Sequence, residues 1–86
     1  MAEYFRMDVV DVFWITGRGA VITGTILEDT IKPGEEIVFG DTVYTVTGVE
    51  SFAGRVKVGD NIGLLLRGGD KEVLSQHLGT EAFLHI

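Results

Sequence analysis

Glycine divides this chain into short segments in which apolar and polar residues alternate. Twelve of the 86 residues are glycine and one is proline, and the stretches between them are rich in valine, isoleucine and threonine. Such stretches favour extended strands, and the glycines favour tight turns. Many short strands in so small a chain favour closure, because a closed barrel removes exposed sheet edges. We therefore predict an all-β fold: a small closed six- or seven-stranded antiparallel β-barrel that forms one domain over residues 1–86.

The same pattern predicts where the elements lie. Residues 5–15 alternate with a change of phase at 9–10, which indicates a bulge or bend. Gly24 interrupts the second segment and indicates a bend or a close backbone approach. Residues 32–35 place proline and glycine at the centre of a type II turn. The other expected elements are strands at 20–28, 36–39, 42–50, 61–67 and 81–86, a hairpin turn at 40–41 and a short helix at 71–76 capped by Asp70.

The chain is acidic. Thirteen Asp and Glu residues oppose seven Lys and Arg residues, which gives a formal net charge of −6. Proteins that bind nucleic acid without regard to sequence need clustered cations that release counterions from the phosphates. The nearest approach to such a cluster is Arg55 with Lys57. The composition therefore argues against generic nucleic-acid binding.

Composition also indicates the cellular compartment in which the protein is expected. The chain has no cysteine, so disulfides and thiolate metal sites are excluded and a reducing cytosol is expected. No apolar run reaches the roughly 18 to 20 residues of a membrane span. Residues 1–4 lack the features of a signal peptide. We expect a soluble, cytoplasmic protein without membrane contact.

Catalytic and cofactor motifs are scarce. Gly19 and Gly24 have the spacing of a P-loop, but Thr25 stands where the phosphate-binding lysine is needed. The glycines also lack the third member of a dinucleotide-binding motif. His77 and His85 are the only imidazoles, too few for a metal cage without carboxylates. We predict no enzyme activity, no cofactor and no bound metal.

Three blocks of the sequence resemble the second domain of elongation factor Tu. The blocks are Asp11–Gly24, Lys32–Glu36 and Val58–Gly68, and they occur in the family's order within a resemblance that spans Phe5–Gly68. The resemblance implies a translation-factor β-barrel. The family's GTPase belongs to a different domain that this chain does not contain, so we expect no GTP binding. Because the chain starts with Met1 and has a full set of strands, we expect an independent product rather than a relic of a larger factor.

The resemblance also implies a binding site for the 3′ end of aminoacyl-tRNA. The second domain of the family helps to form the pocket for the terminal adenosine, and the matching residues here are Glu50, Phe52, Asn61 and Leu65. A carboxylate can accept hydrogen bonds from adenine or ribose, and an apolar wall can stack a base. The alternative is that all four are structural, with the apolar pair in the core, the asparagine in a turn and the glutamate in solvent.

Trp14 gives a second candidate site, because the family has a small polar residue at this position. If Phe13 and Ile15 fill the barrel, Trp14 points outward, since successive strand residues face opposite sides. An exposed tryptophan is a candidate protein-contact anchor. The alternative is that Phe83 or Leu84 covers it.

Two departures from the family affect the expected pocket. Ala53 stands where the family usually has arginine, and the loop at 51–60 is shorter, so one side of the pocket is expected to be incomplete. Together with the acidic charge, these departures favour a stand-alone protein-interaction module with an unidentified protein partner. The alternative is an RNA-binding module for the 3′ end of tRNA or aminoacyl-tRNA, favoured by the four matching residues.

Overall fold

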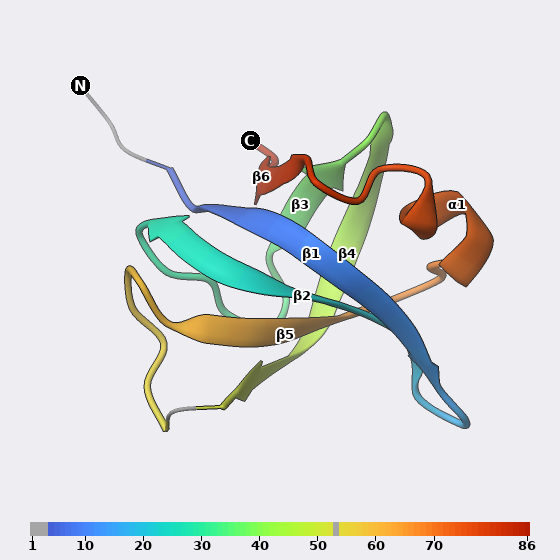
Figure 1. Ribbon diagram of the computed structural model, residues 1–86, viewed down its shortest axis with the longest axis horizontal. Coiled ribbons are helices and arrows are strands. Elements are labelled where there is room, and N and C mark those ends of the chain that lie inside the picture. Colours follow the sequence, from blue (N-terminus) through green and yellow to red (C-terminus); the bar gives the residue numbers. More distant parts are fainter. Residues whose placement is uncertain (1–3, 53) are drawn as a thin grey trace.

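The computed structural model describes residues 4–52 and 54–86. In this part of the chain, six strands form a closed antiparallel barrel in the order β1-β2-β5-β4-β3-β6, and a short helix lies beside it (Figure 1). The predicted all-β antiparallel barrel is confirmed. The elements are β1 Arg6–Ile15, β2 Gly19–Glu28, β3 Glu36–Phe39, β4 Thr42–Ser51, β5 Asn61–Leu66, α1 Lys71–Ser75 and β6 Glu81–Leu84.

The turns form where glycine was expected to form them. Gly34 has φ 98°, and the N–H of Glu35 donates to the carbonyl oxygen of Lys32 at 3.2 Å. This is the arrangement of a type II turn. Gly40 has φ 63° at the first central position of the β3–β4 hairpin. A side chain at either glycine would be strained, so these two residues fix how the chain enters β3 and leaves it.

The predicted bulge lies in β1. The register between β1 and β2 shifts between Val9 and Asp11, which leaves Val10 as an extra residue. Beside the bulge, a Cβ on Gly24 would overlap the carbonyl oxygen of Asp8, so the expected close backbone approach is confirmed. The extra residue changes which side chains of the rest of β1 face the barrel interior.

Apolar side chains fill the barrel, and α1 closes one end. Leu74 of α1 is fully buried, and the carboxylate of Asp70 accepts a hydrogen bond from the N–H of Glu72 at 2.9 Å, as the predicted cap requires. The helix ends at Ser75, one residue earlier than predicted. The largest fully buried side chains are Phe5, Phe39, Met7, Ile22, Ile26, Ile37, Ile62, Leu64, Leu66, Leu74, Val9 and Val46.

Arg6 connects the start of β1 to both neighbouring strands. Its guanidinium lies 3.2 Å from the carboxylate of Glu28 on β2 and 3.1 Å from that of Glu81 on β6. Hydrogen bonds to Glu81 and Glu28 raise the pKa of Arg6. Exposed ion pairs contribute little stability one by one, so we expect this triad to add little to stability although its residues lie on three neighbouring strands.

Candidate binding sites on the barrel surface

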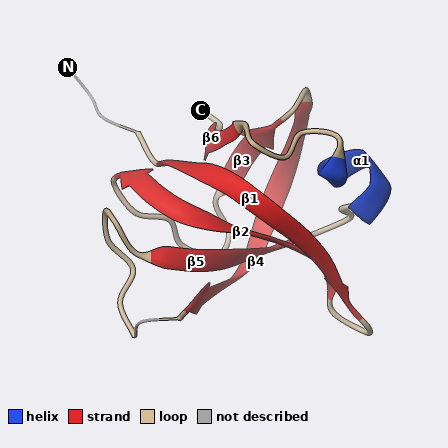
Figure 2. Cartoon of the chain, in the orientation of Figure 1, coloured by secondary structure: helices blue, strands red, loops and turns tan. Residues whose placement is uncertain are grey.

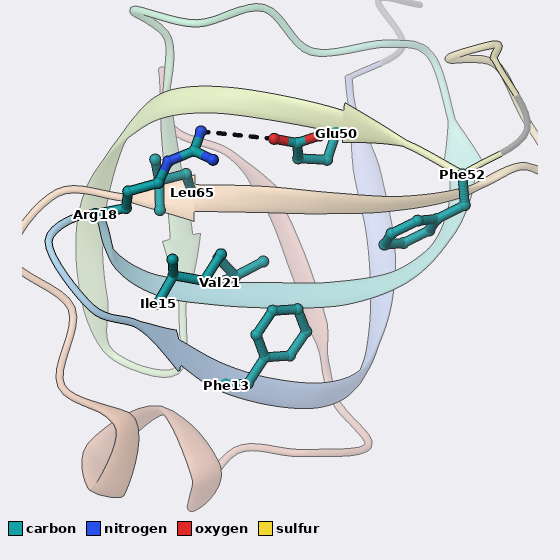
Figure 3. Close-up of a pocket in the computed structure, with 7 residues that line it drawn as sticks. All are labelled: Phe13, Ile15, Arg18, Val21, Glu50, Phe52 and Leu65. Carbon is teal, nitrogen blue, oxygen red and sulfur yellow. Dashed lines mark ion pairs between the residues drawn. The ribbon is translucent and has the colours of Figure 1, made fainter.

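A pocket of about 200 Å³ lies on the outer face of the barrel, over β1, β2, β5 and β4 (Figure 3). Side chains alternate along a strand, and the residues on either side of Val21 and Leu65 are buried in the core. Val21 and Leu65 therefore point outward, and they lie directly opposite each other on paired strands. The pocket is lined by Phe13, Ile15, Arg18, Val21, Glu50, Phe52 and Leu65.

The pocket has an apolar floor and a more exposed rim. Val21 and Leu65 are only 3% and 8% exposed, although they lie outside the barrel. Phe13 at 38% and Phe52 at 63% exposed form part of the rim. Rim side chains thus shield the floor from solvent while leaving the pocket open. This arrangement is suited to a flat apolar group held against the sheet.

Phe52 reaches the pocket because β5 has a glycine beside it. A Cβ on Gly63 would lie 3.7 Å from Cζ of Phe52 and 3.2 Å from Cγ1 of Val21. A larger side chain at Gly63 would therefore fill the space that the aromatic ring borders. Gly63 is paired with Glu50, so the missing side chain also opens the floor beside the carboxylate.

An ion pair crosses one side of the pocket. Nη2 of Arg18 lies 3.5 Å from Oε1 of Glu50, and the two side chains are 54% and 57% exposed (Figure 3). Arg18 is held in the β1–β2 hairpin, where its N–H donates to the carbonyl oxygen of Ile15 at 2.9 Å. An exposed ion pair of this kind is weak. Either partner can therefore exchange the other for a ligand group at small cost.

The structure brings three of the four predicted adenosine-site residues together. Glu50, Phe52 and Leu65 line the pocket. Asn61 is exposed on β5, but it does not line the pocket, and its Oδ1 accepts a hydrogen bond from Oγ1 of Thr25 at 3.0 Å. The structural alternative is wrong for Phe52, which is largely exposed, whereas Leu65 is buried but lies outside the main core cluster and the side chain of Glu50 is exposed to solvent. Ala53, at the position of the family's arginine, lies outside the described residues.

The two cations at 55 and 57 belong to a loop organised by a buried carboxylate. Asp60 is 7% exposed, and its two oxygens accept from Nη2 of Arg55 and from the N–H of Lys57, each at 3.2 Å. The Arg55 guanidinium is thus engaged inside its own loop. This contact does not create a phosphate-binding cluster.

The expectation that Phe13 and Ile15 fill the barrel is wrong. Both line the outer pocket, and Val12 is the buried residue in this part of β1. The bulge at Val10 is the reason, because one extra residue reverses the faces of all that follow. Trp14 is nevertheless 53% exposed, as expected, although it shares the face of Val12.

Trp14 is exposed because β1 extends beyond the strands that would cover it. Phe83 pairs with Arg6, near the other end of β1, so the expected cover by Phe83 or Leu84 is wrong. Trp14 instead borders an open groove of about 710 Å³. The other residues that line this groove are Gly68, Gly69, Asp70, Lys71 and Glu72.

Four residues of the outer pocket were not expected from the sequence. They are Phe13, Ile15, Arg18 and Val21. The sequence did contain the information for two of them. The alternation of apolar and polar residues shifts by one at 9–10, and applying this shift to the rest of the strand places Phe13 and Ile15 on the outer face. Arg18 gave no such signal, because its contact with Glu50 depends on how the hairpin lies over β4 and β5.

No protein-family model matches the chain. Across residues 4–52 and 54–86, His, Cys, Asp and Glu residues do not gather in groups of three or more that could hold a metal ion. No helix among these residues is long and apolar enough to cross a membrane.

Proposed function

We propose that this protein is a non-catalytic, cytoplasmic RNA-binding module whose outer pocket takes the terminal adenosine of a tRNA-like 3′ end. One observation carries the proposal. Glu50, Phe52 and Leu65, which the resemblance to elongation factor Tu implies as adenosine-site residues, line one pocket although they come from two strands and a loop. Their convergence favours this function over the protein-interaction module that the composition favours.

The pocket chemistry suits one nucleoside. Its volume of about 200 Å³ is below the roughly 300 to 1,000 Å³ of pockets that enclose drug-sized ligands, so it suits the base of one nucleoside rather than a larger ligand. A base can lie on Val21 and Leu65 with Phe52 beside it, and aromatic stacking contributes about 1 to 3 kcal/mol per base. The carboxylate of Glu50 can accept from an adenine amino group or a ribose hydroxyl.

The acidic surface limits the affinity. Few cations are available to contact phosphates, and the net charge is −6, so the electrostatic share of RNA binding is small. Recognition then depends on the terminal nucleoside rather than on the length of the RNA. We expect weak binding that prefers one 3′ end.

An NMR titration with short single-stranded RNAs tests the proposal. An RNA ending in CCA is expected to shift the amide signals of Glu50, Phe52 and Leu65 more than an RNA of equal length ending in CCU. Glu50→Ala should remove this preference without unfolding the barrel, because the side chain is 57% exposed. Glu36→Ala, at an exposed residue of β3, is the matched control and should keep the preference. Equal shifts with both RNAs would overturn the proposal.

GTP binding is a separate question with a clear expectation. The chain has the P-loop spacing at Gly19 and Gly24 without the lysine, so the phosphates of GTP lack their usual cationic contact. We expect calorimetry with GTP and magnesium to give no heat of binding at micromolar concentrations. Micromolar affinity would contradict this expectation.

A second candidate function is protein binding through Trp14. A tryptophan that is 53% exposed beside an open groove supports it, since tryptophan is enriched among residues that dominate binding energy. Trp14→Ala should then abolish capture of a specific protein from the source cell. Val10→Ala, at a residue 61% exposed on the same strand, should leave that capture intact. Loss of capture with both variants, or with neither, would count against Trp14 as the anchor.

A further inference from the structure

The second half of β1 has a free backbone edge. β2 pairs with β1 along its whole length, but β6 pairs only with Arg6–Asp8 (Figure 2). The next residue, Val9, exchanges hydrogen bonds with the backbone of Gly79 and Thr80. Beyond Val9, among the residues that the structure describes, no backbone group bonds to β1 on the side away from β2. The ring of strands is closed, but this part of it keeps an edge.

The groups on this edge can be assigned from one hydrogen bond. The N–H of Val12 donates to Oδ1 of Asp11 at 2.8 Å rather than to β2, so it points toward the free side. Backbone groups alternate along a strand, and Trp14 therefore presents its N–H and C=O on the same side. Because the Val12 N–H is already bonded to Asp11, the groups left for a ligand are the C=O of Val12 and the N–H and C=O of Trp14, and another extended chain can match them. A segment that bonds to this edge must therefore be extended.

Trp14, on this edge, borders the groove. The other lining residues are the segment from Gly68 to Glu72, which leads into α1 and starts with two glycines that have no side chains to fill the groove. Trp14 is 53% exposed at the groove's border. A strand added to β1 would lie in the groove and could pack an apolar side chain against the indole.

The charges around the groove favour a basic partner. The groove lining contains Asp70 and Glu72 with Lys71, and Asp11 lies on β1 three residues before Trp14. A second copy of this chain would bring the same carboxylates and a further net charge of −6. Like charges disfavour that pairing, whereas lysine or arginine on an incoming strand complements it.

We propose that the second half of β1 is a docking edge for an extended, basic segment of a partner protein, which adds to the barrel as a strand beside Val12 and Trp14. This inference rests on the second candidate function, protein binding through Trp14. It adds the conformation and the charge of the bound segment. It does not depend on the outer pocket or on RNA.

The test uses a short peptide of alternating lysine and valine. Trp14 is the only tryptophan in the chain, so its fluorescence reports occupancy of the groove directly. We expect a saturable change in fluorescence, and exchange of the Trp14 amide hydrogen should slow by ~10-fold or more once the strand is added. A peptide with glutamate in place of lysine should bind at least ~10-fold more weakly.

Three variants and one modified peptide separate strand addition from simple contact. Trp14→Phe should weaken peptide binding, as followed by amide exchange at Val12 and the neighbouring residues, and Val10→Ala should not. Asp11→Asn keeps an oxygen for the Val12 N–H but removes the charge, so it should weaken binding of the lysine peptide. A peptide with N-methylated valines cannot donate to the edge and should fail to bind.

Each contrary outcome has a defined meaning. If the N-methylated peptide binds equally well, or if Trp14 fluorescence changes without amide protection, strand addition is wrong while protein binding through Trp14 can stand. If the lysine peptide does not bind, the inference is overturned, and capture from the source cell still decides the candidate function. Protection of the Trp14 amide in the protein alone, increasing with protein concentration, would make a second copy the occupant and overturn the basic-partner proposal.

Discussion

The two halves of β1 differ in almost every respect that affects stability and binding. The first half lies between β2 and β6, and its inward side chains, Met7 and Val9, are fully buried. The second half is paired on one side only, and Phe13 and Trp14 are 38% and 53% exposed. The first half of β1 therefore contributes to the core, whereas the second half contributes Val12 to the core and its exposed aromatic residues to the two candidate binding sites. Both exposed aromatic residues of β1 itself lie in the half that β6 does not pair with.

The strongest test of this comparison is Met7→Ala. Truncating a buried methionine removes apolar contacts and leaves a cavity, so we expect a loss of about 2 to 5 kcal/mol in the free energy of unfolding. Chemical denaturation followed by far-ultraviolet circular dichroism measures it. Val10→Ala, at the exposed bulge residue on the same strand, is the control. A loss below about 1 kcal/mol for Met7→Ala would mean that the first half of β1 is not the stabilising half.

Phe13→Ala should have an intermediate effect. The ring is 38% exposed and shields the floor of the outer pocket, so only part of the usual cost of deleting a buried phenylalanine applies. We expect about 1 to 2 kcal/mol, measured by the same denaturation. A loss as large as that of Met7→Ala would show that the outer pocket belongs energetically to the core.

Trp14→Ala should change the free energy of unfolding by no more than about 0.5 kcal/mol, the usual range for surface substitutions. The residue is more than half exposed and borders an open groove. Thermal and chemical denaturation should agree on this. A clear destabilisation would assign Trp14 a packing role and weaken its case as a protein contact.

The smallest effect is expected for the ion pair across the outer pocket. A double-mutant cycle with Arg18→Gln and Glu50→Gln should give a coupling energy below about 0.5 kcal/mol, because both side chains are more than half exposed. Added salt should reduce the coupling further. A coupling above about 1 kcal/mol would mean that breaking the ion pair lowers the affinity of any ligand that displaces one of its partners.

Much of the fold could be predicted from local sequence. The strand segments, the turn at Gly34, the close approach at Gly24 and the cap at Asp70 each depend on neighbouring residues, and all are present. Local rules describe such features well, since they reflect backbone sterics and hydrogen bonding over a few positions.

The site was harder to predict because it depends on register and length. The extra residue at Val10 decides which face Phe13 and Ile15 occupy, and the alternation of residues 13–15 alone gives the opposite answer. The burial of Leu65 outside the barrel depends on pocket-lining side chains from β1, the β1–β2 hairpin, β2 and β4, which are far from it in the sequence. The free edge of β1 follows from the mismatch between a strand of ten residues and a neighbour of four.

The packed interior of the barrel also affects the rates at which a ligand associates and dissociates. Leu74 is fully buried, and large aliphatic side chains fill the space between the strands, so the interior of the barrel does not hold a ligand. Both candidate sites lie outside it and are open to solvent. Binding at either site needs no opening of the fold, so association should proceed at the ordinary rate of about 10⁵ to 10⁷ per molar per second for specific encounters. Differences in affinity between ligands would then arise mainly in how long each one stays.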